Sequence, residues 1–310
     1  MAIYTFAVGA IARRFSNIVN RANDVFRLDW AVTGLPASYT RLLYGGGGSC
    51  AEIKERNWNG ISVVSMIFTT SWDDGHPCDQ RIAEILDRYG LSGSFYLPIR
   101  NCEGYPVMDA NVMRELDKTF EIGSHTLDHS YLPNLTTDAY NFQIISGKHQ
   151  LEDILGHTVG GFCYPGGKIN GAVRQAVIDA NFVYARGINN FWLNCGLDRF
   201  EATTTLQFYP HQRQVLWRNF VKGGHYYERF SVFQTVAVAT DWLSAMKNVV
   251  ALQAETDNVV HIWGHSWEIE KNDLWSQLDN FLKFVSEIRP YTSSVEGLFK
   301  RTEPTQGKMT

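Results

Sequence analysis

Two adjacent carboxylates, Asp73 and Asp74, follow an apolar, β-branched stretch and stand directly before Gly75. Neighbouring carboxylates repel each other, which is costly unless a cation or a proton lies between them. A solvated turn is the alternative interpretation, because Asp-Asp-Gly is a common turn composition. An EF-hand is excluded, since its alternating Asp and Asn ligands are missing. The pair therefore indicates either a turn or a cation site.

Two histidines, His125 and His129, are separated by three residues and also follow an apolar stretch. This spacing lets both imidazoles reach one metal ion, from a helix or from a turn after a strand. Pro133 shortly afterwards argues against a helix, so we expect a strand-to-loop turn. Considered alone, the segment leaves metal binding and a structural role equally open.

A third strand-like stretch ends at Cys163 and Tyr164 and continues into Pro165-Gly166-Gly167. Such a turn can direct a backbone N–H into a cleft, although most Pro-Gly turns only reverse the chain.

A fourth stretch carries His261, Trp263 and His265 at every second position, so their side chains face the same way. We expect His265 at the mouth of the site with Trp263 below it. For His261 we expect a hydrogen-bonded histidine in the core.

These residues follow strands in a chain that alternates strand and helix patterns from Ile61 onward. Strand patterns cover 61–72, 92–99, 121–125, 161–164, 182–188 and 259–263, and helical patterns cover 79–89, 110–117, 137–155, 171–181, 233–254 and 274–288. The alternation predicts a parallel sheet, open or closed into a barrel, with functional groups at the carboxyl ends of its strands. We interpret the irregular, aromatic segment 189–230 as an inserted loop on the substrate side.

Composition limits the class of function. The chain has 28 basic and 32 acidic residues and a net charge of −4, so no basic face for nucleic acid is indicated. Five dispersed cysteines without a Cys-x-x-Cys pair indicate neither a zinc ribbon nor a disulfide framework. The apolar run 2–12 is too short for a membrane span, and its charges follow it where a signal peptide needs them before it. The sequence does not indicate a compartment.

Taken in order, the four segments resemble the polysaccharide deacetylase family, the NodB homology domain of carbohydrate esterase family 4. The family's first motif, Thr-Phe-Asp-Asp, aligns with Ser71-Trp72-Asp73-Asp74, and its second, His-Ser/Thr-x-x-His, is matched fully by 125–129. Its third, often Arg-Pro-Pro-Tyr-Gly, is matched in part by 163–167. Its fifth, an apolar strand ending in His, is matched by 262–265.

The resemblance covers about residues 61–300 and implies an α/β fold, a distorted (β/α) barrel of about seven parallel strands. That length suits one barrel better than two domains. We therefore expect an N-terminal extension over 1–60, a catalytic barrel over 61–300 and a tail over 301–310. The extension contains the linker-like run 45–49, a composition compatible with poor order.

The resemblance also implies roles for individual residues. Asp74, His125 and His129 would hold one divalent metal ion, with Asp73 as general base and His265 as general acid. One carboxylate and two imidazoles leave a coordination position open, as catalytic metal sites do. Zinc is the ion that we expect, with cobalt, nickel or manganese as alternatives.

The same resemblance assigns the substrate side of the site. The backbone N–H of Gly166, beside Tyr164 and Pro165, would help the metal to hold the oxyanion. Trp263 would line the pocket for the acetyl methyl group.

Two departures from the family pattern affect these assignments. Cys163 stands where the third motif has the arginine that braces the catalytic Asp, and Arg186 on the next strand is the candidate substitute, with a surface arginine as the equal alternative. The fourth motif has no clear counterpart, and Asp241-Trp242 and Asp198 are weak candidates. We do not expect Cys163 to be a nucleophile, because a metal-activated water leaves it no evident role.

We therefore expect a metal-dependent hydrolase that removes N-acetyl, or O-acetyl, groups from a carbohydrate. One alternative is hydrolysis of a non-sugar amide or cyclic imide on the same scaffold. Another is a carbohydrate-binding relative without turnover, against which the presence of Asp73 and His265 argues. The expected partner is an N-acetylated carbohydrate, and the sequence indicates neither which sugar nor the oligomeric state.

Overall fold

The computed structural model describes residues 56–58, 61–63 and 65–300. They belong to one of two compact units of the chain, Gly48–Thr310, and the other unit, Met1–Gly47, lies outside the described residues. The predicted extension over 1–60 and the tail over 301–310 fall almost wholly outside them, so the domain division stays a prediction.

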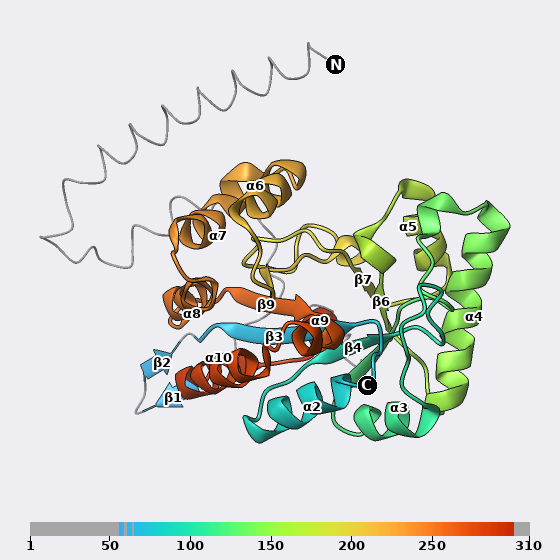
Figure 1. Ribbon diagram of the computed structural model, residues 1–310, viewed down its shortest axis with the longest axis horizontal. Helices are drawn as coiled ribbons and strands as arrows, with labels where there is room; N and C mark the ends of the chain where they lie inside the picture. The colour runs from blue at the N-terminus through green and yellow to red at the C-terminus, as the bar shows by residue number, and fades with distance from the viewer. Residues whose placement is uncertain (1–55, 59–60, 64, 301–310) are drawn as a thin grey trace, which may run out of the picture. The chain divides into compact units, whose positions relative to one another are not determined.

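Seven of the eight strands of the central sheet are parallel neighbours in the order β7-β6-β5-β4-β3-β9-β8 (Figure 1). Their bounds are β3 (Ile67–Asp73), β4 (Ser94–Leu97), β5 (Glu121–Ser124), β6 (Gly161–Cys163), β7 (Tyr184–Arg186), β8 (Leu206–Gln207) and β9 (Val259–Gly264). A parallel bridge between Arg186 of β7 and Ala202, shortly before β8, brings the two ends of this order together. The sheet is therefore a distorted barrel, which confirms the predicted fold class.

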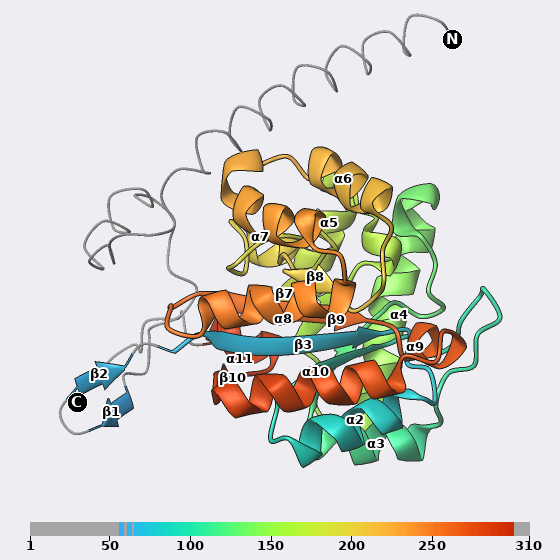
Figure 2. The ribbon, with the colours of Figure 1, turned by 60° about the vertical axis from the view of Figure 1, so that its left-hand side comes forward.

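Helices connect the strands and cover the outside of the barrel; β3 lies between α8 and α10 in Figure 2. Their bounds are α2 (Asp79–Arg88), α3 (Ala110–Asp117), α4 (Thr137–Leu155), α5 (Gly171–Asp179), α6 (Arg213–Lys222), α7 (Tyr226–Val238), α8 (Trp242–Gln253), α9 (Ser266–Lys271), α10 (Trp275–Ile288) and α11 (Val295–Lys300), with short 3₁₀ turns at η2 (Leu132–Asn134), η3 (Pro165–Gly167) and η4 (Arg199–Glu201). Local sequence explains several ends, since Asp109 and Asn170 cap α3 and α5, and left-handed Gly156 ends α4. Among the described residues, no helix combines the length and the apolar character that a membrane crossing requires.

Two apolar clusters form the core. The larger one lies between the strands and the surrounding helices and includes Phe68, Phe95 and Phe281. The smaller one joins residues of β3, β4, β6, β7 and β9, among them Tyr96 and Tyr184, to residues of α11. Since this second cluster draws on most of the strands, it fills the barrel interior below the carboxyl ends that carry the polar residues.

The strand predicted over 61–72 is two separate strands. β2 (Ile61–Val63) pairs antiparallel with β1 (Arg56–Trp58) outside the barrel, and only β3, which also pairs with the short β10 (Tyr291–Thr292), belongs to it. The sequence between β1 and β2 is Asn-Gly, the pair that two-residue hairpins favour, and this signal was overlooked.

The interpretation of 189–230 as an irregular loop is wrong, whereas its place on the substrate side stays a prediction. The segment contains β8, α6 and the first residues of α7, and the single helix predicted over 233–254 is interrupted between α7 and α8. Its aromatic side chains Phe191, Phe208 and Phe220 are buried in the core. These three aromatic side chains therefore stabilise the fold.

Candidate active site

The predicted metal ligands lie on loops with unusual backbone conformations. Asp74, directly after β3, has a φ of 78°, and Thr126 and His129, after β5, have φ values of 70° and 63°. Positive φ is uncommon for residues other than glycine and tends to occur at functional sites, where the surrounding structure imposes it. Here the positive φ values turn the chain sharply in the two loops, after β3 and after β5, that must bring the ligands together.

The donor atoms of Asp74, His125 and His129 converge in a buried position. Asp74 Oδ1 lies 3.5 Å from His125 Nε2 and 3.1 Å from His129 Nε2, and all three residues are at most 6% exposed. Ligand atoms about 2.0–2.1 Å from a tetrahedral zinc ion lie roughly 3.3 Å from one another. Asp74 Oδ1 is also buried without a hydrogen-bond donor among the described residues. This donor set therefore fits a divalent ion.

The other polar atoms of two ligands are held in place by neighbours. Asp74 Oδ2 accepts a hydrogen bond from Trp267 Nε1 at 2.8 Å, and His125 Nδ1 donates to the carbonyl oxygen of Cys163 at 2.8 Å. Since a carbonyl can only accept, the neutral form of His125 carries its proton on Nδ1 and has Nε2 available to bind a metal. Burial opposes the charge on Asp74, but the adjacent imidazoles hold the pKa of its carboxyl well below the usual range. The carboxylate is therefore ionised, as a metal ligand must be.

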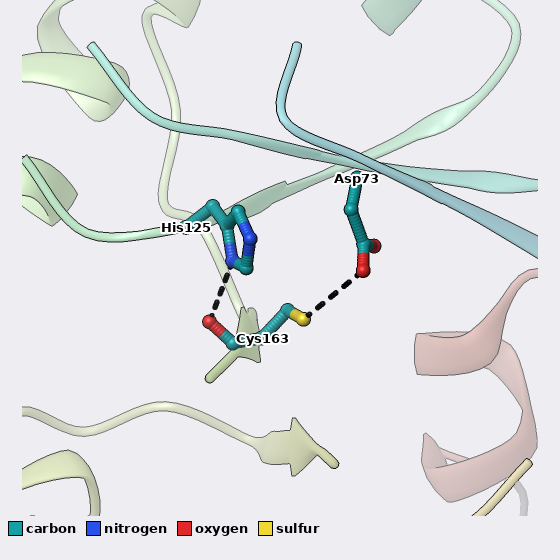
Figure 3. Close-up of side chains that lie close together, drawn as sticks. All are labelled: Asp73, His125 and Cys163. Atoms are coloured by element: carbon teal, nitrogen blue, oxygen red, sulfur yellow. Dashed lines mark hydrogen bonds between the residues drawn. The ribbon is translucent and has the colours of Figure 1, made fainter. Parts of the chain in front are cut away.

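A second group of donor atoms comes from Asp73, His125 and Cys163, which Figure 3 shows, and it shares His125 with the first group. His125 Nδ1 is occupied by the Cys163 carbonyl, so only its Nε2 is available, and Asp74 and His129 surround that atom. Asp73 is in addition paired with a guanidinium, whose charge opposes a cation at the same carboxylate. The first group is therefore the better metal site.

Asp73 is held from two neighbouring strands. Arg186 Nη2 donates to Asp73 Oδ1, and the Cys163 thiol faces Asp73 Oδ2 at 3.8 Å. Cys163 and Arg186 are paired in register on β6 and β7, so both side chains reach the same carboxylate from one level of the barrel. The Arg186 guanidinium is fully buried and lies over the rings of Tyr96 and Trp263. The surface alternative for Arg186 is wrong.

His265 is coupled to Glu268. Its Nδ1 donates to Glu268 Oε2 at 2.6 Å, and its Nε2 lies 3.9 Å from Asp74 Oδ2. Burial opposes the charge on His265, but the hydrogen bond to Glu268 and the nearby Asp74 raise its pKa to about 9. Gln207 Nε2 also donates to Glu268, at 2.9 Å, which fixes the carboxylate in turn.

The Pro-Gly-Gly turn lies against the same site. Gly166 has a φ of 58°, and a Cβ at this position would come within 2.8 Å of the Tyr131 ring, which packs against the imidazole of His129. Pro165 is buried, and the hydroxyl of buried Tyr164 donates to the carbonyl of Phe200, away from the metal ligands. Glycine is therefore required at 166, and Tyr164 serves the fold.

The two β9 residues singled out in the sequence have different surroundings: His261 lies in the core and Trp263 contacts His265. His261 is buried and bonded to the Ser71 hydroxyl and the Thr203 carbonyl, which confirms the expected core histidine. Trp263 donates from Nε1 to Asn190 and packs edge-on against His265.

The structure corrects the candidates for the fourth motif. Asp241 caps α8, and Asp198 pairs with Arg174, so each has a local structural partner. Glu268, three residues after His265, is the acidic residue that contacts this histidine. Trp267, the donor to Asp74, was also missed. Trp267 and Glu268 both follow His265 closely in the sequence. The i,i+3 spacing from His265 to Glu268 is the signal that could have identified Glu268 as its partner.

Comparisons with known proteins show which proteins this chain is similar to. Residues 63–185 match the family model of polysaccharide deacetylases, and no curated protein matches the chain. A Streptococcus pyogenes deacetylase is 16% identical with a TM-score of 0.41, and the match covers 44% of this chain and 62% of that one, less than two thirds.

Two further solved structures are similar over more of the chain. A family 4 acetyl xylan esterase from Clostridium thermocellum, in complex with cobalt, is 15% identical with a TM-score of 0.48 and coverage of 76% and 90%. A family 4 carbohydrate esterase from Streptomyces lividans, in complex with acetate, is 13% identical with a TM-score of 0.45 and coverage of 73% and 88%. Similarity at this level assigns neither substrate nor activity.

Proposed function

We propose that this chain, whose residues 63–185 match the polysaccharide deacetylase family model, is a metal-dependent hydrolase that removes N-acetyl, or O-acetyl, groups from a carbohydrate. One observation carries the proposal. The buried donor atoms of Asp74, His125 and His129 converge beside Asp73, a carboxylate that is not needed to hold the ion.

Asp74, His125 and His129 would hold the ion, with zinc expected and cobalt, nickel or manganese as alternatives. When bound, a divalent ion polarises the acyl carbonyl and makes water more acidic. All three side chains are almost fully buried, so the protein itself excludes bulk water from the ligand atoms.

Asp73 accepts the proton of the attacking water. Arg186 donates a hydrogen bond to Asp73 Oδ1, so Oδ2 is the oxygen that takes the proton. The Cys163 thiol near Oδ2 is a weak donor at 3.8 Å and competes little with water.

His265 donates a proton to the departing amine. Because Nδ1 is bonded to Glu268, Nε2 is the atom that faces the reaction. Its pKa of about 9 keeps the imidazole protonated near neutral pH, as a general acid must be. Gly166 would donate its backbone N–H to the oxyanion and Trp263 would line the acetyl pocket.

Acetate release from N-acetylglucosamine oligomers and from acetylated xylan tests the proposal, measured with and without a chelator. We expect release that the chelator abolishes, and a loss of roughly 10²–10⁴-fold in Asp73→Asn and in His265→Ala. Asp241→Asn is the matched control, because this exposed carboxylate only caps α8 and asparagine caps equally well.

Two outcomes would contradict the proposal. Absence of release from every substrate with metal bound would favour a non-sugar amide or cyclic imide as substrate. Full activity after complete metal removal would exclude the metal-dependent mechanism.

A further inference from the structure

The three metal-ligand side chains differ in what their outward polar atoms contact. Asp74 and His125 each have a hydrogen-bond partner there, Trp267 and the Cys163 carbonyl respectively. His129 Nδ1 is buried and has no hydrogen-bond partner among the described residues. Imidazoles that bind a metal through one nitrogen almost always donate the other N–H to a carboxylate, a carbonyl or water. The site therefore lacks one outer contact, at His129.

A carboxylate lies next to this nitrogen. Glu103 Oε2 is 3.8 Å from His129 Nδ1, on the loop between β4 and α3. The Glu103 backbone N–H donates to Asn101 Oδ1 at 2.8 Å, which holds the backbone at Glu103 in place. The carboxylate also lies near the Tyr131 phenol, and its negative charge raises the pKa of Tyr131 to about 12. Glu103 is thus held close to His129 by contacts that do not involve the ligand atoms.

We propose that Glu103 is the outer-sphere acceptor for the Nδ1–H of His129 and positions this imidazole for the metal. The distance exceeds a usual N–H···O separation by roughly 0.6–1 Å, which rotation of a partly exposed glutamate side chain can close. The contact fixes the proton on Nδ1, leaves Nε2 unprotonated and turns it towards Asp74. This inference rests on the metal site of the proposed function and adds a residue outside the family motifs.

Metal affinity measures the contribution of Glu103 without any substrate. Loss of an outer-sphere partner costs about 10–100-fold in metal affinity, so we expect a loss of this size in Glu103→Ala. The probe is Co²⁺, titrated against a competing chelator. Glu115→Ala is the control for removal of a surface carboxylate, since Glu115 is exposed and paired only with Lys118. Thermal unfolding of the metal-free variants checks that folding is intact.

Glu103→Asp separates contact from long-range charge. Aspartate keeps the charge but withdraws the carboxylate by one methylene, so we expect affinity as low as in Glu103→Ala. Wild-type affinity in Glu103→Asp would show that only charge matters and would overturn the inference.

A spectroscopic readout reports the contact directly. In the ¹⁵N spectrum of the zinc-loaded protein, we expect the Nδ1–H resonance of His129 to shift in Glu103→Ala while that of His125, bonded to a backbone carbonyl, stays in place. Unchanged Co²⁺ affinity and an unmoved His129 resonance would refute the role of Glu103 alone. Failure of the wild-type protein to bind Co²⁺ would instead refute the metal site itself.

Discussion

Replacement of Arg186 by methionine tests whether this residue acts through Asp73. The guanidinium is fully buried, donates to Asp73 Oδ1 and lies 5.1 Å and 5.2 Å from the ring centres of Tyr96 and Trp263. Methionine keeps much of the volume and removes the charge. Asp73, itself 3% exposed, then remains as an uncompensated buried carboxylate.

The expected cost follows from this geometry. Breaking a buried ion pair from one side costs about 3–5 kcal/mol, and the stacking on two rings adds to it. For a domain of this size, each kcal/mol lowers the unfolding temperature by roughly 2–4 °C, so we expect a fall of roughly 6–20 °C. Turnover should fall by up to the roughly 10²–10⁴-fold that a general base supplies, measured as acetate release well below the unfolding transition.

A double-mutant cycle with Asp73→Asn distinguishes two roles of Arg186, positioning of Asp73 for turnover and stabilisation of the fold alone. If Arg186 acts through Asp73, adding Arg186→Met to Asp73→Asn should cost little further turnover, because the base is already lost. The double variant should also regain part of the lost stability, since neither buried charge is then unpaired. Losses of turnover that multiply fully in the double variant would refute the reasoning.

Three further changes test other contacts of the site. Because turnover needs protonated His265, it should fall as the pH rises through a pKa of about 9, and Glu268→Gln should move this alkaline limb lower by roughly 1–3 pH units; an unmoved limb would contradict the coupling. Trp267→Phe removes the donor to Asp74 and should weaken Co²⁺ binding by about 10-fold or more in a chelator titration, whereas unchanged binding would show that this contact is dispensable. Cys163→Ala should retain turnover in the acetate assay, and a loss as deep as that of Asp73→Asn would reopen a chemical role for the thiol.

The part of the site that the sequence predicted is carried by short, local patterns. Asp74 and the His125–His129 pair each stand in one loop, so their convergence needs only that β3 and β5, which flank β4, end at the same edge of the sheet. The parallel sheet followed from the same logic, since strand and helix patterns alternate over most of the chain after residue 61, whereas the distorted barrel was implied by the family resemblance. Local periodicity is a strong signal because a helix or strand that buries one face repeats its apolar residues with the period of that element.

The parts that were missed depend on packing over long sequence distances. β8 has only two residues, too few for any periodicity, and it is a strand because it pairs with Ile262 and Trp263 of β9. The aromatic residues Phe191 and Phe208, before and after β8, are buried only because other parts of the chain, such as α6 and α7, complete the core cluster around them. Glu103 is separated from His129 along the chain by α3 and β5, so its proximity could not be inferred from spacing.

The exchange of the bracing residue follows from the barrel geometry. In parallel strands, residues in register present their side chains to the same face, and Cys163 on β6 is in register with Arg186 on β7. A small side chain at 163 leaves room beside Asp73, and the guanidinium one strand further away fills it between Tyr96 and Trp263. The missing motif arginine is therefore no sign of a lost function, because the same charge reaches the same carboxylate from the neighbouring strand. A sequence motif records residues along one strand. The Asp73 carboxylate, in contrast, pairs with a guanidinium at its own level of the barrel, whichever strand carries the arginine.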